Sequence, residues 1–268
     1  MYASLAQLYD CFREKSPAAK VDLLNGLDDK DPRLAQILSR AGSNAVQVPA
    51  QSEVGYPAQP VLVDARRLPK RSLASKSGRG AFFHAICHIE FTAINLALDA
   101  ALRFPGMPEA YYADWLRIAK EEALHFDLLQ KHLAEIGFRY GEFEAHDGMW
   151  QLAERTAHDV LLRMGLVPRV LEARGLDVTP PMIERLKQAG DANGAALLAR
   201  IYADEIGHVA AGTRWFNYAA HERGMDPEDA FVDIVEQEFG KLRLNQFNQE
   251  GRLLAGFTQH ELERISSQ

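Results

Sequence analysis

One nine-residue pattern occurs twice in this chain, and it constrains the fold more than any other feature of the sequence. Residues 117–125 and 200–208 both read Arg-Ile-x-x-acid-Glu-x-x-His, where x is any residue. In an α-helix, residues three positions apart lie on one face, so the glutamate and the histidine of each pattern point toward the same neighbour. The repeat therefore predicts two long helices that each present a carboxylate and an imidazole near the middle.

The Glu/His pairs of the repeat fall within the apolar stripes of their predicted helices. Glu122 and His125 lie in one stripe, and Glu205 and His208 lie in the other. An apolar stripe packs against the rest of the protein, and a buried carboxylate is costly unless it is paired or bound to a metal. The pattern favours a metal site over its alternative, a satisfied network of core salt bridges.

A two-metal site in a helical bundle needs one more glutamate from each of two further helices. Glu90 interrupts an apolar face 32 positions before Glu122, and Glu172 stands 33 positions before Glu205. Two alternatives remain open: Glu154 competes with Glu172, and Glu90 is instead a buried partner of an arginine. The spacing predicts six metal ligands: Glu90, Glu122, His125, Glu172, Glu205 and His208.

Helical spacing of the apolar residues predicts an all-α protein in four segments. Residues 1–42 read as a helical layer, and residues 43–78, interrupted by prolines, read as an extended arm. Residues 79–224 read as a four-helix bundle. Residues 225–268 read as C-terminal helices and a tail that pack on this bundle.

Prolines and glycines set the expected helix boundaries within the bundle. Pro168 is expected to kink or split the third helix, because proline lacks the N–H of a helical hydrogen bond. A turn is expected at 177–181, followed by a shorter helix to about residue 189. The long helices are expected at about 80–103, 108–137, 149–175 and 192–223.

Charge and cysteine content limit the classes of function. The net charge is −7, which disfavours bulk binding to DNA or to anionic membranes. Cys11 and Cys87 belong to no Cys-x-x-Cys motif, so neither a disulfide framework nor a zinc-thiolate site is expected. We see no signal peptide and no apolar stretch long enough to cross a bilayer, and we expect a cytoplasmic protein.

The predicted arm contains a cluster of cations. We interpret them as solvated or internally paired, and a strip that contacts phosphate or RNA is the alternative. The cations are Arg66, Arg67, Lys70, Arg71, Lys76 and Arg79.

From about residue 68 to the C-terminus, the chain resembles the ferritin-like superfamily of di-iron carboxylate proteins. More closely, it resembles a bacterial ferritin-like family that is catalogued as a domain of unknown function. It is distantly similar to the tRNA-hydroxylating di-iron monooxygenases. The resemblance implies a ferritin-like four-helix bundle with a metal site, and no established reaction. Its carriers are His84-x3-His88-Ile89-Glu90, residues 121–126, Tyr140-Gly141-x4-His146, residues 167–177 and residues 204–209 with Trp215-Phe216.

The predicted ligand set indicates an oxidoreductase that uses O2. Mixed carboxylate and imidazole ligands suit iron, with Mn/Fe as an alternative pair. Glu122 and Glu205 are the candidate bridging ligands, Glu90 and Glu172 the terminal carboxylates, and one histidine caps each metal. An external donor supplies electrons, and the substrate is an unknown small molecule or tRNA. Two alternatives remain, a ferroxidase or other iron-handling protein and a non-catalytic, metal-stabilised helical interaction protein, and a homodimer is possible.

Overall fold

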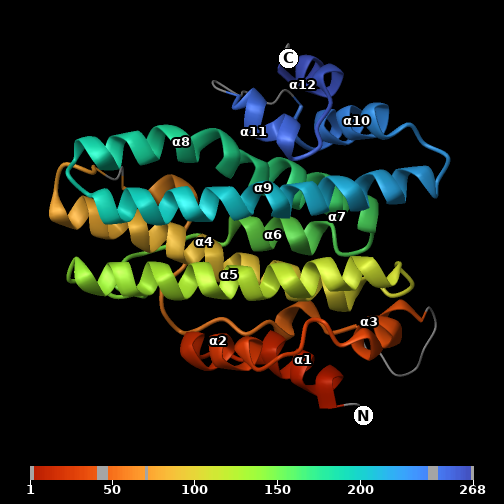
Figure 1. Ribbon diagram of the computed structural model, residues 1–268, viewed down its shortest axis with the longest axis horizontal. Coiled ribbons are helices and arrows are strands. Elements are labelled where there is room, and N and C mark those ends of the chain that lie inside the picture. Colours follow the sequence, from red (N-terminus) through yellow and green to blue (C-terminus); the bar gives the residue numbers. More distant parts are fainter. Residues whose placement is uncertain (1–2, 41–47, 70–71, 241–246, 267–268) are drawn as a thin grey trace. The chain divides into compact units, whose positions relative to one another are not determined.

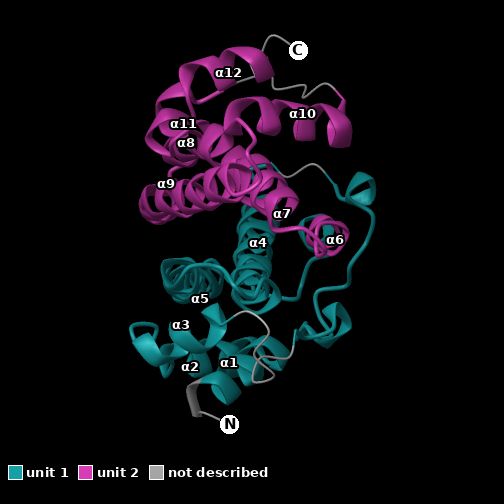
Figure 2. Ribbon diagram, turned by 90° about the vertical axis from the view of Figure 1, so that its right-hand side faces the viewer, with its two compact units in different colours: residues 1–150 teal, residues 151–268 magenta. Residues whose placement is uncertain are grey.

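The computed structural model describes residues 3–40, 48–69, 72–240 and 247–266, and its regular structure is helical (Figure 1). Within these residues, β pairing is limited to one isolated parallel bridge between Leu62 and Ala145. The prediction of an all-α protein is confirmed. The chain divides into two compact units, Met1–Trp150 and Gln151–Gln268, which Figure 2 shows in different colours.

The centre of the first unit is a pair of long helices, α4 (Lys76–Arg103) and α5 (Glu109–Glu135). The connection over 104–108 is short, so the two helices pack side by side as a hairpin. The helix α4 begins earlier than the predicted residue 80, because the Ser75 side chain accepts a hydrogen bond from the Gly78 N–H at 3.0 Å.

Three short helices cover one side of this hairpin: α1 (Ala3–Arg13), α2 (Pro17–Asn25) and α3 (Pro32–Ser39) (Figure 1). The helix α1 contacts α4, whereas α2 and α3 contact α5. Asp31 caps α3 by accepting the Arg33 N–H at 3.0 Å.

The segment over 48–69 is extended apart from two 3-10 turns, η1 (Gln51–Glu53) and η2 (Ala65–Arg67). It is held to the 138–147 crossover, since the Val63 N–H donates to the Ala145 carbonyl at 2.8 Å. In the basic cluster, the exposed Arg66 side chain pairs with Asp64 at 2.6 Å. Lys70 and Arg71 lie outside the described residues.

In the second unit, α8 (Ala173–Gln188) and α9 (Ala192–His221) form another hairpin. The helix α7 (Val160–Leu166) passes into α8 through η3 (Val167–Glu172), a π-helical segment. This segment begins beside Pro168, where a kink is predicted. Before them lies α6 (Gly148–Arg155), and after them come α10 (Pro227–Phe239), α11 (Gln249–Leu254) and α12 (Gln259–Ser266).

The predicted turn at 177–181 is wrong, because α8 runs unbroken through Pro180 and Pro181. Proline offers no N–H, so Pro180 leaves the Leu176 carbonyl without its helical donor. The Asn248 side-chain amide takes that place and donates to Leu176 at 3.0 Å. A residue far along the chain thus compensates the break that the two prolines would otherwise impose.

The expectation that no stretch is long and apolar enough to cross a bilayer needs correction at α4. By length and composition alone, α4 meets that test. However, 78% of its most apolar window is buried inside the protein. The apolar character of α4 therefore matches its position as a core helix.

Candidate metal centre

Three predicted ligands meet inside the first unit. Glu90 comes from α4, and Glu122 and His125 come from α5. His125 Nδ1 lies 3.2 Å from a Glu90 carboxylate oxygen and 3.6 Å from a Glu122 carboxylate oxygen. The potential ligand atoms of the three residues all lie within 4.8 Å of one another. We call Glu90, Glu122 and His125 the first ligand group.

The first ligand group is buried, with residue exposures of 4%, 2% and 0% for Glu90, Glu122 and His125. Burial alone would lower the pKa of His125, but hydrogen bonds to Glu122 and Glu90 raise it to about 11. Two buried carboxylates therefore hold a positive charge between them. A divalent cation satisfies the same demand, and its binding would displace the imidazole proton. This buried Glu/His cluster can hold a metal ion.

The neighbouring cysteine does not compete as a ligand. The Cys87 thiol is buried one turn before Glu90 on α4, and its Sγ lies 3.9 Å from the Phe126 carbonyl. Burial raises the pKa of Cys87 well above its usual value, and the charge of Glu90 raises it further. Cys87 is not among the side chains whose ligand atoms converge with Glu90, Glu122 and His125, so oxygen and nitrogen are the donor atoms of this cluster.

Two other histidines on α4 bind the crossover rather than the cluster. His84 Nε2 accepts a hydrogen bond from the Gly141 N–H at 2.9 Å. His88 Nδ1 lies 2.9 Å from the Tyr140 hydroxyl. Burial, reinforced by His84 and His146, lowers the pKa of His88 to about 4, so this imidazole is neutral at physiological pH. Both histidines fix the loop that covers this end of the helix pair.

The other three predicted ligands lie in the second unit, and we call Glu172, Glu205 and His208 the second ligand group. His208 is fully buried, and its Nδ1 lies 3.3 Å from a Glu205 carboxylate oxygen. Glu172 is half-buried at the last position of η3. The competing Glu154 is exposed on α6.

A close contact between η3 and α9 fixes the backbone that carries Glu172. The ring of Pro168 packs on Gly212, one helical turn after His208, and a Cβ at Gly212 would lie only 2.3 Å from Pro168 Cβ. Only glycine leaves room for this approach. The sequence analysis did not predict this role of Gly212. The sequence offered one signal for it, a glycine that follows the predicted ligand His208 by one helical turn.

Arg169 also anchors η3 through contacts of its side chain. Its buried guanidinium pairs with Glu261 of α12 at 2.7 Å. The guanidinium carbon lies 3.9 Å from the ring centre of Phe231, and 4.8 Å and 4.6 Å from those of Phe216 and Phe257. An ion pair and three aromatic rings therefore hold the segment in place.

Comparison with known proteins gives this chain a family. The model of the family described as "Protein of unknown function (DUF455)" matches residues 13–263. The chain belongs to this family. A relative from Haemophilus influenzae, described as an uncharacterized protein, is 41% identical over 266 residues, which cover 97% of this chain and 92% of the relative. No solved structure matches the chain significantly.

Membership of this family confirms the predicted resemblance to a family catalogued by its unknown function. The description of the family states no reaction. In this member of the family, the first ligand group supports metal binding most directly.

Proposed function

We propose that this chain is a ferritin-like di-iron carboxylate protein in which the two ligand groups hold one pair of iron ions. The observation that carries the proposal is the buried cluster of Glu90, Glu122 and His125. The sequence repeat supplies the same residue types a second time, as Glu172, Glu205 and His208. Four carboxylates and two imidazoles are the ligand set of two-metal sites in helical bundles.

The charge of the ligands supports two metals rather than one. Four carboxylates bring four negative charges, which two divalent cations balance and one does not. Glu122 and Glu205, each paired in sequence with a histidine, are the proposed bridging ligands. Glu90 and Glu172 bind terminally, and His125 and His208 each bind one metal. Iron suits this mixture of oxygen and nitrogen donors, and a Mn/Fe pair is the variant of the same proposal.

The proposed activity is O2-dependent oxidation of an organic substrate. In a hydroxylation, the substrate R–H, O2, two electrons and two protons give R–OH and water. An external donor supplies the electrons. The iron pair, when bound, supplies the site of O2 reduction, and this chain's residues hold the metals and exclude bulk water. The substrate is a small molecule or tRNA.

Metal analysis of the purified protein tests the proposal. We expect two iron ions per chain after anaerobic loading with Fe(II), and an O2-dependent absorption change. The variants Glu122→Ala and Glu205→Ala should each retain less than one iron ion, because each removes a bridging carboxylate. The variant Glu109→Ala, at an exposed position of α5, is the matched control and should retain both ions.

The outcomes separate the candidate functions. Full metal retention in both Glu→Ala variants would show that the ligand assignment is wrong. Bulk oxidation of Fe(II) without turnover of any organic substrate would favour iron handling. A protein that binds no metal, with an unchanged melting temperature in Fe(II), would favour the non-catalytic alternative.

A further inference from the structure

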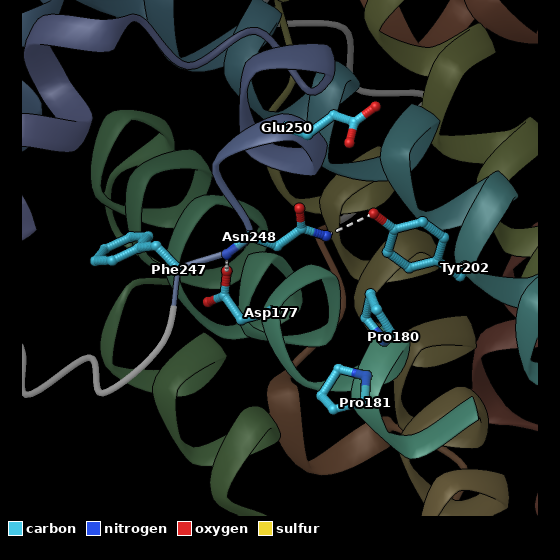
Figure 3. A pocket seen from close by; sticks show the side chains of 7 residues that line it. All are labelled: Asp177, Pro180, Pro181, Tyr202, Phe247, Asn248 and Glu250. Atoms are coloured by element: carbon cyan, nitrogen blue, oxygen red, sulfur yellow. Dashed lines mark hydrogen bonds between the residues drawn. The ribbon is translucent and has the colours of Figure 1, made fainter. Parts of the chain in front are cut away.

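A pocket of about 510 Å³ opens in the second unit, between α8, α9 and the start of α11 (Figure 3). It has the size of a small-molecule site and combines apolar rings with a few fixed polar groups. Its lining residues are Asp177, Pro180, Pro181, Tyr202, Phe247, Asn248 and Glu250.

Asn248 forms a fixed wall of this pocket. Its side-chain amide donates to the Tyr202 hydroxyl oxygen at 2.7 Å (Figure 3). The same amide donates to the Leu176 carbonyl at 3.0 Å. Its side-chain oxygen accepts the Gly251 N–H at 3.1 Å, and its own N–H donates to Asp177 at 3.0 Å. The amide hydrogens of Asn248 are thus used within the protein, and its position does not depend on a ligand.

The hydrogen bond from Asn248 positions the Tyr202 hydroxyl as a hydrogen-bond donor to the pocket. Because its oxygen accepts from Asn248, the hydroxyl hydrogen is directed elsewhere and is available to a ligand acceptor. The approach of the hydroxyl requires glycine at position 251, since a Cβ there would lie 2.7 Å from the Tyr202 oxygen. The geometry therefore supplies a pre-positioned hydrogen-bond donor.

The charge of the pocket is negative. The Arg252 guanidinium binds both carboxylate oxygens of Asp177, at 2.9 Å and 2.7 Å, and so neutralises this acid. Arg252 also covers the Phe247 ring, with 4.6 Å between the guanidinium carbon and the ring centre. The exposed carboxylate of Glu250 remains at the rim and favours a cationic group. The rings of the lining prolines and of Phe247 favour an apolar body.

The pocket lies close to the second ligand group along both helices of its hairpin. Tyr202 precedes Glu205 by three residues on α9, a rise of about 4.5 Å, and shares its helix face. Asp177 follows Glu172 by five residues, a rise of roughly 7.5 Å. The Tyr202 backbone thus lies about one helical turn along α9 from that of Glu205.

We propose that this pocket binds a small organic amine that also carries a hydrogen-bond acceptor, and that this amine is the substrate class of the metal centre. The acceptor pairs with the Tyr202 hydroxyl, and the ammonium group faces Glu250. The apolar body packs on the proline rings. The substrate role rests on the proposed function, whereas binding in the pocket does not.

Three matched probes test binding to the metal-free protein by NMR titration. Tyramine has both an acceptor and an ammonium group, 2-phenylethylamine lacks the acceptor, and 3-(4-hydroxyphenyl)propionate reverses the charge. We expect tyramine to bind about three- to tenfold more tightly than either relative. Tyr202→Phe should make tyramine and 2-phenylethylamine bind equally tightly. Glu250→Gln should make tyramine and the propionate bind equally tightly. Glu263→Gln, at an exposed position of α12, should change neither ratio.

Equal binding of the three probes, or ratios that survive Tyr202→Phe and Glu250→Gln, would overturn the pocket assignment. A second measurement loads the protein with Mn(II) and follows the relaxation of the tyramine protons. Strong relaxation places the probe beside the metal and supports the substrate role, whereas its absence with Mn(II) bound overturns that role alone. Failure to bind either Mn(II) or Fe(II) contradicts the proposed function, while the metal-free titration still reports on the pocket.

Discussion

The two ligand groups repeat one sequence pattern, but their backbones differ. Glu90, Glu122 and His125 stand on two uninterrupted helices, and the Glu122 side chain is 2% exposed. Glu172 instead ends a π-helical segment, and the Glu205 side chain is 16% exposed. The repeat therefore preserves ligand chemistry without preserving backbone support. The pocket that we assign to a substrate is lined by residues of α8 and of α9, and α9 also carries Glu205 and His208 of the more open group.

The two units also bury their cations differently. Lys20 in the first unit is fully buried, and its ammonium donates to the Asn95 side chain at 2.6 Å and to the Phe12 carbonyl at 3.2 Å. Arg169 in the second unit keeps its charge beside Glu261. A buried lysine can lose its proton, but an arginine cannot, so Arg169 depends on its long-range ion pair with Glu261, whereas Lys20 is held by neutral acceptors.

The largest effect is predicted for a variant that breaks the ion pair between Arg169 and Glu261. Glu261→Gln should lower the free energy of unfolding by about 3–5 kcal/mol, because it leaves the buried charge of Arg169 without its partner. Denaturant unfolding measures this change, with the exposed Glu263→Gln on the same helix as control. A loss below 1 kcal/mol would show that the three aromatic rings alone anchor η3.

The second prediction concerns the pH dependence of stability. Burial lowers the pKa of Lys20 from 10.5 to about 7. Between these values the unfolded chain binds a proton that the folded chain lacks, so the stability due to Lys20 rises with pH. From pH 7 to pH 9, the unfolding free energy of the wild type should therefore rise by about 2.5 kcal/mol relative to that of Lys20→Met.

Taking the difference between wild type and variant isolates Lys20, since His125 and the other buried groups titrate in both proteins. The range stops at pH 9 because Cys11, whose pKa burial raises to about 12, is electrostatically coupled to Lys20, so its titration above that pH differs between the two proteins and does not cancel. A difference that is flat across the range would mean that Lys20 stays charged when buried. The exposed Lys187→Met is the control.

The third prediction compares two glycines of α9, one packed against η3 and one in open space. Gly212→Ala should destabilise the protein by about 2 kcal/mol, because the new methyl overlaps the ring of Pro168. It should also weaken metal binding, since η3 carries Glu172. Gly207→Ala on the same helix meets no atom within 4 Å and should instead stabilise by about 0.5–1 kcal/mol. Thermal unfolding of the two variants, which should shift in opposite directions, measures the contrast.

The smallest predicted effect is at Gly175 of α8. A Cβ there meets no atom within 4 Å, so Gly175→Ala should raise the unfolding free energy by about 0.5–1 kcal/mol through reduced chain entropy. Denaturant titration measures this gain. A loss of stability would mean that α8 needs glycine at this position for a reason other than space.

Local spacing was enough to predict the helices that carry five of the ligands, but not the helix that carries Glu172, which was expected over 149–175 and is instead broken after Arg155 and continues past residue 175. The observed α5 and α9 lie within a few residues of their predicted bounds. Three predicted ligands meet in the first unit, as the helical face of the repeat requires. The four predicted segments, the ferritin-like bundle and the six-ligand centre stay predictions.

Features that depend on distant residues could not be predicted from local patterns. The helix α8 survives Pro180 because Asn248 supplies a donor from a separate part of the chain. The same asparagine builds the pocket beside Tyr202. The π-helical segment depends likewise on Gly212 and on Glu261, which lie 44 and 93 positions after Pro168.

The claim that the two ligand groups share one pair of metals is tested most directly by iron K-edge X-ray absorption of the protein loaded with two equivalents of Fe(II). We expect an iron–iron distance of about 3.5–4 Å. This signal should disappear in both Glu122→Ala and Glu205→Ala, and persist in Glu109→Ala. Iron bound without any iron–iron signal, or a signal that survives loss of either bridging carboxylate, would contradict the account.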